Sequence, residues 1–148
     1  MSTEPGDYRK LFTVAEANAA LTYVRAIVRD LVRLTKEVIE RRERLSGLLA
    51  GRDEDDTDIY SQELDQVKEE LDKDGRQLHE YLDEIRQIGA VPQNGAEGLV
   101  DFPSLKDGRV VFLCWRLGEP EIQHWHEVDA GFIGRQPLVA DSVGPGNS

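Results

Sequence analysis

Apolar residues recur every three or four positions over two long stretches of the chain, which is the spacing of one face of an α-helix. In the first stretch they form a heptad-like seam that is broken only at Thr35 and Arg42. The pattern predicts a helix over residues 13–50 and a second helix over residues 58–89, joined by an acidic turn at residues 51–57. We therefore expect a long antiparallel helical hairpin.

The ends of these helices carry residues that are typical of helix caps. Thr13 and Glu16 have the spacing of a capping box, in which each side chain accepts a hydrogen bond from the backbone amide of the other residue. Gly51 suits the end of the first helix, and Gly89, followed by Pro92, suits the end of the second. The acidic residues of the turn favour the start of the second helix, because carboxylates interact well with a helix N-terminus.

Thr35 falls opposite Asp74, the one polar break in the apolar pattern of the second helix, when the helices are folded back about the turn. In that register Val38 lies beside Leu71, and Thr35 faces Asp74. A polar residue in an apolar seam is costly unless a partner accepts its hydrogen bond. We therefore predict that Thr35 and Asp74 pair within the seam; the alternative is that both point to solvent.

The apolar face of the first helix is wider than one partner helix can cover. The residues that flank the seam are Ile27, Val32, Leu34, Ile39 and Leu48. Either the C-terminal region or a second copy of the chain must bury them. We expect a homodimer in which two hairpins form a four-helix bundle through the first helix, with packing against a local sheet as the competing explanation.

The pattern changes from helical to extended after a joint rich in turn residues. Aromatic and β-branched residues predict a small antiparallel β module over residues 97–129. A short strand at residues 99–103 is expected to end near its proline, and longer strands follow at residues 109–117 and 122–128. The last two strands form a hairpin around a short turn.

The register of that hairpin decides which side chains share a face of the sheet. In the simplest register Cys114 lies opposite Trp125, and Trp115 lies opposite His124. Alternation then places His124 and His126 on one face and Cys114 on the other. This prediction separates the cysteine from both imidazoles.

These elements together predict an α+β fold, mostly α, in which a long antiparallel two-helix coiled-coil hairpin precedes a small antiparallel β-sheet module. A length of 148 residues suits one domain. We place it at residues 13–140, with a glycine-punctuated loop at residues 130–140. Residues 1–12 are expected to form a flexible N-terminal segment and residues 141–148 a flexible tail.

Charge and composition argue against several classes of function. A net charge of −11 provides no field that attracts a phosphate backbone, so we expect no nucleic-acid binding. No stretch approaches the roughly 20 continuous apolar residues that span a bilayer. The N-terminus lacks the pattern of a signal peptide, and a lone cysteine agrees with a reducing compartment. We therefore expect a cytoplasmic protein that does not insert into membranes.

The charge is unevenly divided between the two helices. Residues 53–88 hold 14 acidic and 4 basic side chains, whereas residues 14–52 hold 8 basic and 5 acidic ones. The two segments are therefore oppositely charged, as two helices that pack on each other could be.

Four segments of the chain resemble the sequence pattern of a known family. They are Phe12-Thr13-x-x-Glu16-Ala17-Asn18, the run from Leu113 to Glu121, Trp125-His126-Glu127, and Asp129-Ala130-Gly131-Phe132-x-Gly134-Arg135-Gln136-Pro137. The chain is similar in these segments to an uncharacterised bacterial family, domain of unknown function 2203. The resemblance implies a bacterial, soluble, single-domain protein, and it implies no activity, cofactor or catalytic residue.

His124 and His126 lie one residue apart on a predicted strand, so that both imidazoles project to the same side. Two imidazoles in this position could chelate zinc or another divalent transition metal. The alternative is that both rings stack on Trp115 and bond to carboxylates or backbone. A metal site needs a third ligand, for which the candidates are Glu119, Glu121, Glu127, Asp129 and, from a helix, His79.

Two further side chains have chemistry that needs an interpretation. We interpret Cys114 as a buried structural thiol rather than a nucleophile, because the predicted register separates it from both histidines. Arg135 could contact an anion through its guanidinium group, and an internal salt bridge to Glu127 or Asp129 is the favoured alternative.

No complete catalytic or cofactor motif occurs in the sequence. We therefore favour a non-catalytic homodimeric interaction or scaffold protein. The alternative is a small metal-binding protein, or a metal-dependent enzyme, that uses His124 and His126.

Overall fold

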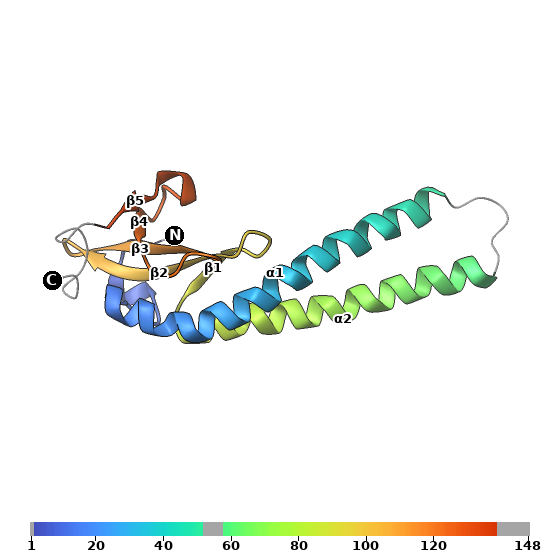
Figure 1. Cartoon of the computed structure of the whole chain (residues 1–148), viewed down its shortest axis with the longest axis horizontal. Helices are drawn as coiled ribbons and strands as arrows, with labels where there is room; N and C mark the ends of the chain where they lie inside the picture. The colour runs from blue at the N-terminus through green and yellow to red at the C-terminus, as the bar shows by residue number, and fades with distance from the viewer. Residues whose placement is uncertain (1, 52–57, 139–148) are drawn as a thin grey trace.

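The structure is a computed structural model that describes residues 2–51 and 58–138. Within these residues two long helices pack against each other, and a five-stranded antiparallel sheet follows, so the predicted α+β fold is confirmed (Figure 1). The helices are α1 (Val14–Ala50) and α2 (Asp58–Ile88), and the strands are β1 (Val91–Asn94), β2 (Leu99–Lys106), β3 (Arg109–Arg116), β4 (His124–Glu127) and β5 (Gln136–Pro137). Short 3-10 turns occupy Pro5–Asp7 and Phe132–Gly134.

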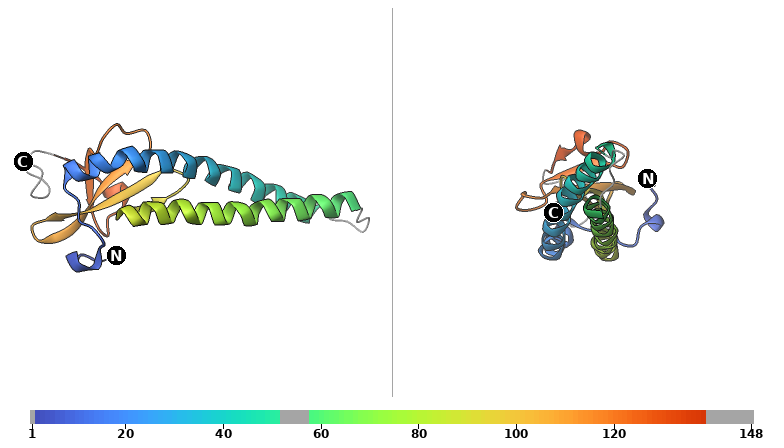
Figure 2. Two further views of the ribbon diagram at one scale, coloured as in Figure 1. Left: turned by 90° about the horizontal axis from the view of Figure 1, so that it is seen from below. Right: turned by 90° about the vertical axis from the view of Figure 1, so that its right-hand side faces the viewer.

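The sheet lies across one end of the helical hairpin. Its strands follow chain order, β1-β2-β3-β4-β5, which makes it a simple meander. Figure 2 shows the two helices side by side beneath the sheet, and both figures show the rest of the hairpin extending beyond it. No helix in the described part of the chain is long and apolar enough to cross a membrane.

The predicted start of α1 and the predicted end of α2 are both present in the structure. The Glu16 amide donates to Thr13 Oγ1 at 3.1 Å and the Thr13 amide donates to the Glu16 carboxylate at 2.9 Å, so the capping box is confirmed. Gly89 follows α2 with a φ of 104°, a left-handed conformation that favours glycine. Residues 52–57 of the predicted acidic turn and the predicted tail at 141–148 lie outside the described residues.

Thr35 and Asp74, which we predicted to pair within the helical seam, each bond to a different partner. The Thr35 hydroxyl donates to the Leu31 carbonyl of its own helix at 2.7 Å, and Asp74 accepts a hydrogen bond from Arg41. A serine or threonine in a helix readily bonds to the carbonyl four residues earlier, and a guanidinium forms a stronger bond to a buried carboxylate than a hydroxyl does. The prediction that Thr35 and Asp74 pair with each other is therefore wrong.

The sheet covers part of the wide apolar face of α1. Ile27 and Val32 pack against the core that the helices form with the sheet, whereas Ile39, further along α1, is 44% exposed. The part of the face around Ile27 and Val32 is thus covered by the chain's own sheet, which was the competing explanation to a second copy. The largest buried members of this core include Phe102, Leu113, Trp115, Ile85 and Val28.

Strand β2 is longer than predicted, because it continues through Pro103 to Lys106. Strand β1 pairs only with residues 99–101 of β2, so none of the described strands lies beyond that edge at Pro103. The Pro103 carbonyl points to this open edge and accepts a hydrogen bond from the Phe12 amide at 2.6 Å. The missing N–H of the proline faces the same edge, so it removes no bond from the ladder with β3. Strands β1 and β5 were not predicted.

The predicted register between β3 and β4 is wrong by one residue. Cys114 lies opposite His124, Leu113 opposite Trp125, and Phe112 opposite His126. The connection between the strands spans residues 117–123 and is longer than the short turn that we predicted. Because side chains alternate along a strand, a shift of one residue moves each of them to the other face. Cys114 therefore shares a face with both histidines.

The N-terminal segment, for which we expected flexibility, packs on the second face of the sheet, which is the face that points away from the helices. The Val110 amide donates to the Thr3 carbonyl at 3.1 Å, and the Tyr8 ring meets Phe112 edge-on at 6.0 Å between centroids. Together with Leu11, Tyr8 covers a small second core that is separate from the core between the helices and the sheet. Part of the second face is left to polar side chains, and these form the candidate site.

Candidate functional site

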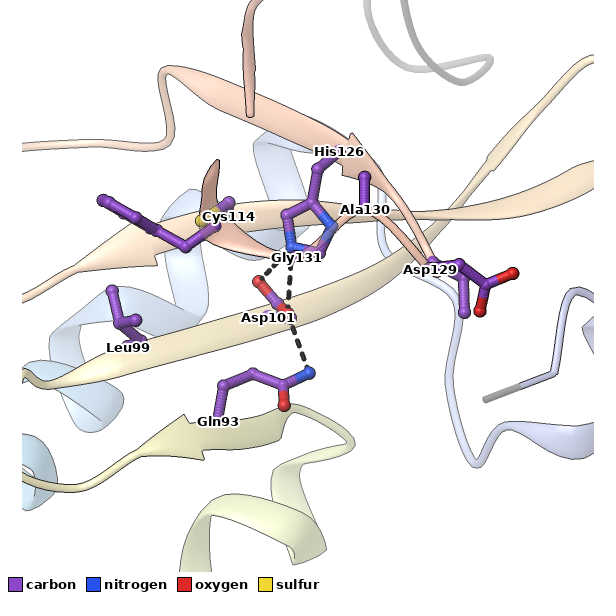
Figure 3. Close-up of a pocket in the computed structure, with 10 residues that line it drawn as sticks. Gln93, Leu99, Asp101, Cys114, His126, Asp129, Ala130 and Gly131 are labelled. Atoms are coloured by element: carbon purple, nitrogen blue, oxygen red, sulfur yellow. Dashed lines mark hydrogen bonds and ion pairs between the residues drawn. The ribbon is translucent and has the colours of Figure 1, made fainter. Parts of the chain in front are cut away.

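Three polar side chains from neighbouring strands converge on the second face of the sheet (Figure 3). Asp101 comes from β2, Cys114 from β3 and His126 from β4, and each is only 2% exposed. One potential ligand atom from each residue lies within 4.8 Å of the others. Asp101 and Cys114 are direct cross-strand neighbours, and His126 reaches them from the next row of the sheet.

The two ring nitrogens of His126 have different partners. Nδ1 lies 2.7 Å from the Glu127 carbonyl oxygen and must donate to it, because a carbonyl oxygen only accepts. Nε2 lies 3.0 and 3.1 Å from the two oxygens of Asp101. With an ionised Asp101 both nitrogens donate, so the pair consists of an imidazolium and a carboxylate.

Burial and the neighbouring charge act in opposite directions on His126. Burial alone lowers the pKa of His126, but the hydrogen bond and the negative charge of Asp101 outweigh it, so the pKa is raised above its ordinary value. Burial, helped by the charge of Asp101, raises the pKa of Cys114 to about 12. At neutral pH Cys114 is therefore a thiol, which is a poor nucleophile.

Asp101 is the acceptor at the centre of the cluster. Besides His126, its carboxylate accepts a hydrogen bond from the Gln93 amide at 2.9 Å, and the Cys114 sulfur lies close to it. Donors from β1 and β4 therefore converge on one carboxylate of β2. Its negative charge is balanced by the imidazolium, so the buried cluster is neutral as a whole.

A pocket of about 370 Å³ opens beside the cluster. Asp101, Cys114 and His126 line its floor, and Leu99, Val128 and Phe132 are among the apolar residues of its wall. Asp129 also lines the pocket, but Figure 3 shows its carboxylate directed away from the Asp101–His126 pair. A small molecule in this pocket would therefore meet the polar side chains of the cluster and an apolar wall.

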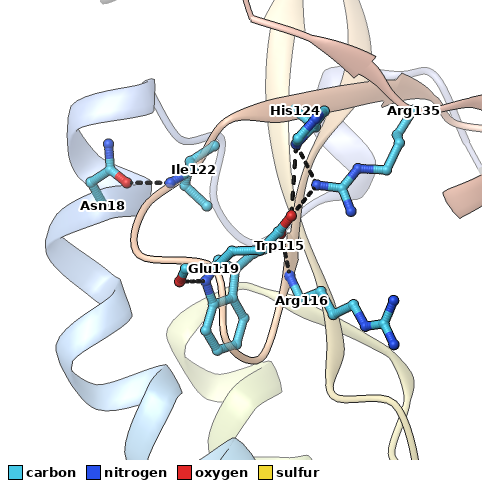
Figure 4. A network of polar contacts seen from close by, with 7 residues as sticks. All are labelled: Asn18, Trp115, Arg116, Glu119, Ile122, His124 and Arg135. Atoms are coloured by element: carbon cyan, nitrogen blue, oxygen red, sulfur yellow. Dashed lines mark hydrogen bonds and ion pairs between the residues drawn. The ribbon is translucent and has the colours of Figure 1, made fainter.

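The second histidine of the predicted pair belongs to a different network (Figure 4). His124 Nδ1 accepts a hydrogen bond from the Arg135 guanidinium, which only donates, and lies 3.8 Å from the Glu119 carboxylate. His124 and His126 do lie on the same face, as alternation requires, but they bind different groups.

The other predicted ligands and contacts are also dispersed. Arg135 forms an internal salt bridge, as the favoured alternative expected, but with Glu119 at 2.5 Å rather than with Glu127 or Asp129. Glu127 lies on the opposite face and pairs with Arg109. The side chains of Glu121, Asp129 and His79 are exposed. One donor of Arg135, Nε, is buried without an acceptor among the described residues.

Sequence reasoning missed Asp101 and Gln93 as parts of the site. The sequence predicts a short strand around Asp101 but not its pairing with β3, which places Asp101 beside Cys114. One signal was available: Asp101 is a single acidic residue in an otherwise apolar strand, Leu99-Val100-Asp101-Phe102. A lone charge at a position that a sheet buries needs a partner, which makes such a residue a site candidate.

Comparison with known proteins identifies the family but no activity. The family described as "Uncharacterized conserved protein (DUF2203)" matches residues 10–138. This match spans most of the 148 residues, so the chain belongs to that family and the resemblance is confirmed. No curated protein and no solved structure matches the chain.

Proposed function

We propose that this member of the DUF2203 family binds one divalent transition-metal ion of the zinc class through Asp101, Cys114 and His126. Carboxylate oxygen, thiolate sulfur and imidazole nitrogen are the ligands that zinc takes in proteins. The observation that carries the proposal is the convergence of one of each, fully buried and within 4.8 Å of one another, on the floor of a pocket.

The charge of the cluster favours a divalent ion. One carboxylate and one thiolate balance the two positive charges of the metal, so the loaded cluster is neutral. The metal-free cluster is neutral as well, because the Asp101 carboxylate and the His126 imidazolium cancel and the Cys114 thiol is uncharged. The metal therefore takes the place of the Nε2 and Sγ protons without adding a net charge to a buried site.

Neighbouring groups orient the proposed ligands. The bond from His126 Nδ1 to the Glu127 carbonyl leaves Nε2 directed at the cluster, and histidine ligands in metal sites commonly have such a bond on their other nitrogen. Gln93 holds the Asp101 carboxylate from β1 in the same way. Little rearrangement is needed beyond the loss of the two protons.

Calorimetric titration of zinc into chelator-treated, tag-free protein tests the proposal. We expect one zinc per chain and the release of about two protons, measured from the dependence of the binding heat on the buffer. His126→Gln and Cys114→Ser should each weaken binding at least tenfold. His124→Gln is the matched control, since it changes the same residue type on the same strand and face. Wild-type protein that binds no zinc, or equal weakening by H124Q and H126Q, would refute the site.

As a second function we propose self-association of two copies through the hairpin extension, as a homodimeric interaction or scaffold module. The hairpin extends beyond the sheet (Figure 1), and Ile39 and Leu49 in the C-terminal half of α1 are 44% and 48% exposed. Two-fold pairing would also bring α1 of one copy against the strongly acidic α2 of the other. Opposite charge and exposed apolar side chains support the same surface.

Light scattering over a range of concentrations tests this association. We expect a dimer mass for the wild type and a monomer mass for Ile39→Lys, Leu49→Lys. Ile133→Lys is the control, because Ile133 is 99% exposed but lies in the loop before β5 rather than on the hairpin. A monomer mass for the wild type throughout the micromolar range would rule out this proposal.

A further inference from the structure

The proposed metal site has fewer protein ligands than zinc requires. Zinc in proteins is usually four-coordinate, and structural sites take all four ligands from side chains. In the part of the chain that the structure describes, only three such side chains converge here. Sites of this kind that keep one position open bind water or a substrate there.

Nearby polar side chains are poorly placed to fill the fourth position. The Gln93 amide is engaged with Asp101, and His124 is engaged with Arg135 and Glu119. The Asp129 carboxylate is exposed and points away from the cluster (Figure 3). The fourth position therefore faces the pocket.

The pocket limits what could bind at that position. Its volume of about 370 Å³ accommodates a molecule larger than water, and its wall includes Leu99, Val128 and Phe132. Because one carboxylate and one thiolate already balance a divalent ion, an anionic ligand would add an uncompensated charge beside an apolar wall. A neutral ligand would not.

We propose that the metal held by Asp101, Cys114 and His126 has an open fourth position that binds a compact, neutral ligand with one nitrogen or oxygen donor and an apolar body. This inference rests on the proposed metal site. The donor atom would coordinate the metal on the pocket floor, and the apolar body would lie against Val128 and Phe132.

Cobalt-loaded protein provides the test, with imidazole as the neutral probe and azide as the anionic probe. Cobalt(II) occupies zinc sites, a charge-transfer band reports its bond to the Cys114 thiolate, and its visible absorption changes with the ligands. We expect imidazole to change the visible spectrum saturably and to bind more tightly than azide. Phe132→Ala should weaken imidazole binding about tenfold, which corresponds to the loss of about 1.4 kcal/mol of apolar contact.

Two further variants are needed: one controls for changes in the loop, and the other tests a second residue of the pocket wall. Ile133→Ala alters the next residue, which is 99% exposed, and should leave imidazole affinity unchanged. Val128→Ala trims another part of the wall and should weaken binding in the same direction as F132A.

The outcomes separate this inference from the proposed function. A thiolate–cobalt band with a visible spectrum that imidazole never changes would mean a closed metal site, which overturns the inference and leaves metal binding in place. Absence of the band in cobalt-treated protein would overturn the metal site itself. Azide binding as tight as imidazole binding would overturn the preference for a neutral ligand. Equal effects of F132A and I133A would overturn the contact between the ligand and Phe132.

Discussion

Replacement of Asp101 by Asn tests the charges that we assign to the buried cluster. The substitution preserves the shape of the side chain but removes the negative charge that His126 Nε2 contacts at 3.0 and 3.1 Å. The imidazolium has two N–H donors, of which Nδ1–H is bound to the Glu127 carbonyl. In D101N the imidazolium is therefore buried without a counter-charge unless it loses a proton.

The magnitude follows from the burial of both partners. Removal of one partner from a buried ion pair typically costs about 3–5 kcal/mol of folding free energy. We expect the lower end, about 3 kcal/mol, since His126 can shed its Nε2 proton and accept a hydrogen bond from the new amide. For a chain of this length, such a loss lowers the melting temperature by roughly 6–12 °C.

The pH dependence of this loss has a definite sign. The pKa of His126 is raised in the folded protein above its ordinary value of 6.5. A group with a raised folded-state pKa stabilises the protein fully below the unfolded-state pKa, and this stabilisation disappears as the pH rises through the folded-state pKa. The difference between wild type and D101N should therefore be largest below pH 6.5 and should shrink in alkaline solution.

Urea unfolding of chelator-treated protein, at about pH 6 and about pH 9, measures both the size and the sign of the effect. Asp107→Asn is the matched control, because Asp107 is exposed in the β2–β3 turn with a φ of 53°, a conformation that Asn adopts equally well. The ion-pair reasoning is refuted if D101N costs no more than D107N at the lower pH. It is also refuted if the loss for D101N is undiminished at the higher pH.

Three further outcomes follow from the packing and capping of the chain. Phe102→Ala should lower the free energy of unfolding by about 4 kcal/mol, because Phe102 is fully buried and meets Phe12 edge-on; a loss below about 1 kcal/mol in urea titrations would contradict this core. Thr13→Ala should lower the free energy of unfolding by about 1 kcal/mol, because it removes the helix cap. An unchanged urea midpoint would show that the cap does not stabilise α1. Cys114 should react with iodoacetamide only as fast as the protein opens, because it is buried and its pKa is raised to about 12; alkylation of native protein as fast as in urea would contradict its burial.

The parts of the fold that could be predicted are those determined by nearby residues. The heptad-like pattern and the Thr13–Glu16 capping box act within one helix, and the structure has α1 and α2 where they indicate. Strand β3 was expected from its own composition. Strands β1 and β5 are short and exist because longer strands offer them an edge, so their own residues carry little signal. The passage of β2 through Pro103 likewise depends on where β1 stops.

The candidate site depends on a register that the apolar pattern of β3 leaves undetermined. A strand with one apolar and one polar face specifies its register, because a slip of one residue would expose the apolar face. Strand β3 is buried on both faces from Val110 to Trp115, so its own pattern does not distinguish the two registers.

One contact with α1 and one contact within the β3–β4 connection accompany the observed register. The loop of residues 117–123 is bonded to α1 by the Ile122 amide, which donates to Asn18 Oδ1 at 2.7 Å, and is folded under Trp115, whose Nε1 donates to the Glu119 carbonyl at 2.9 Å (Figure 4). A loop held in this way places His124 rather than Trp125 opposite Cys114. The meeting of Cys114, His126 and Asp101 is therefore a consequence of how the helix holds a distant loop, which a strand pattern read by itself does not contain.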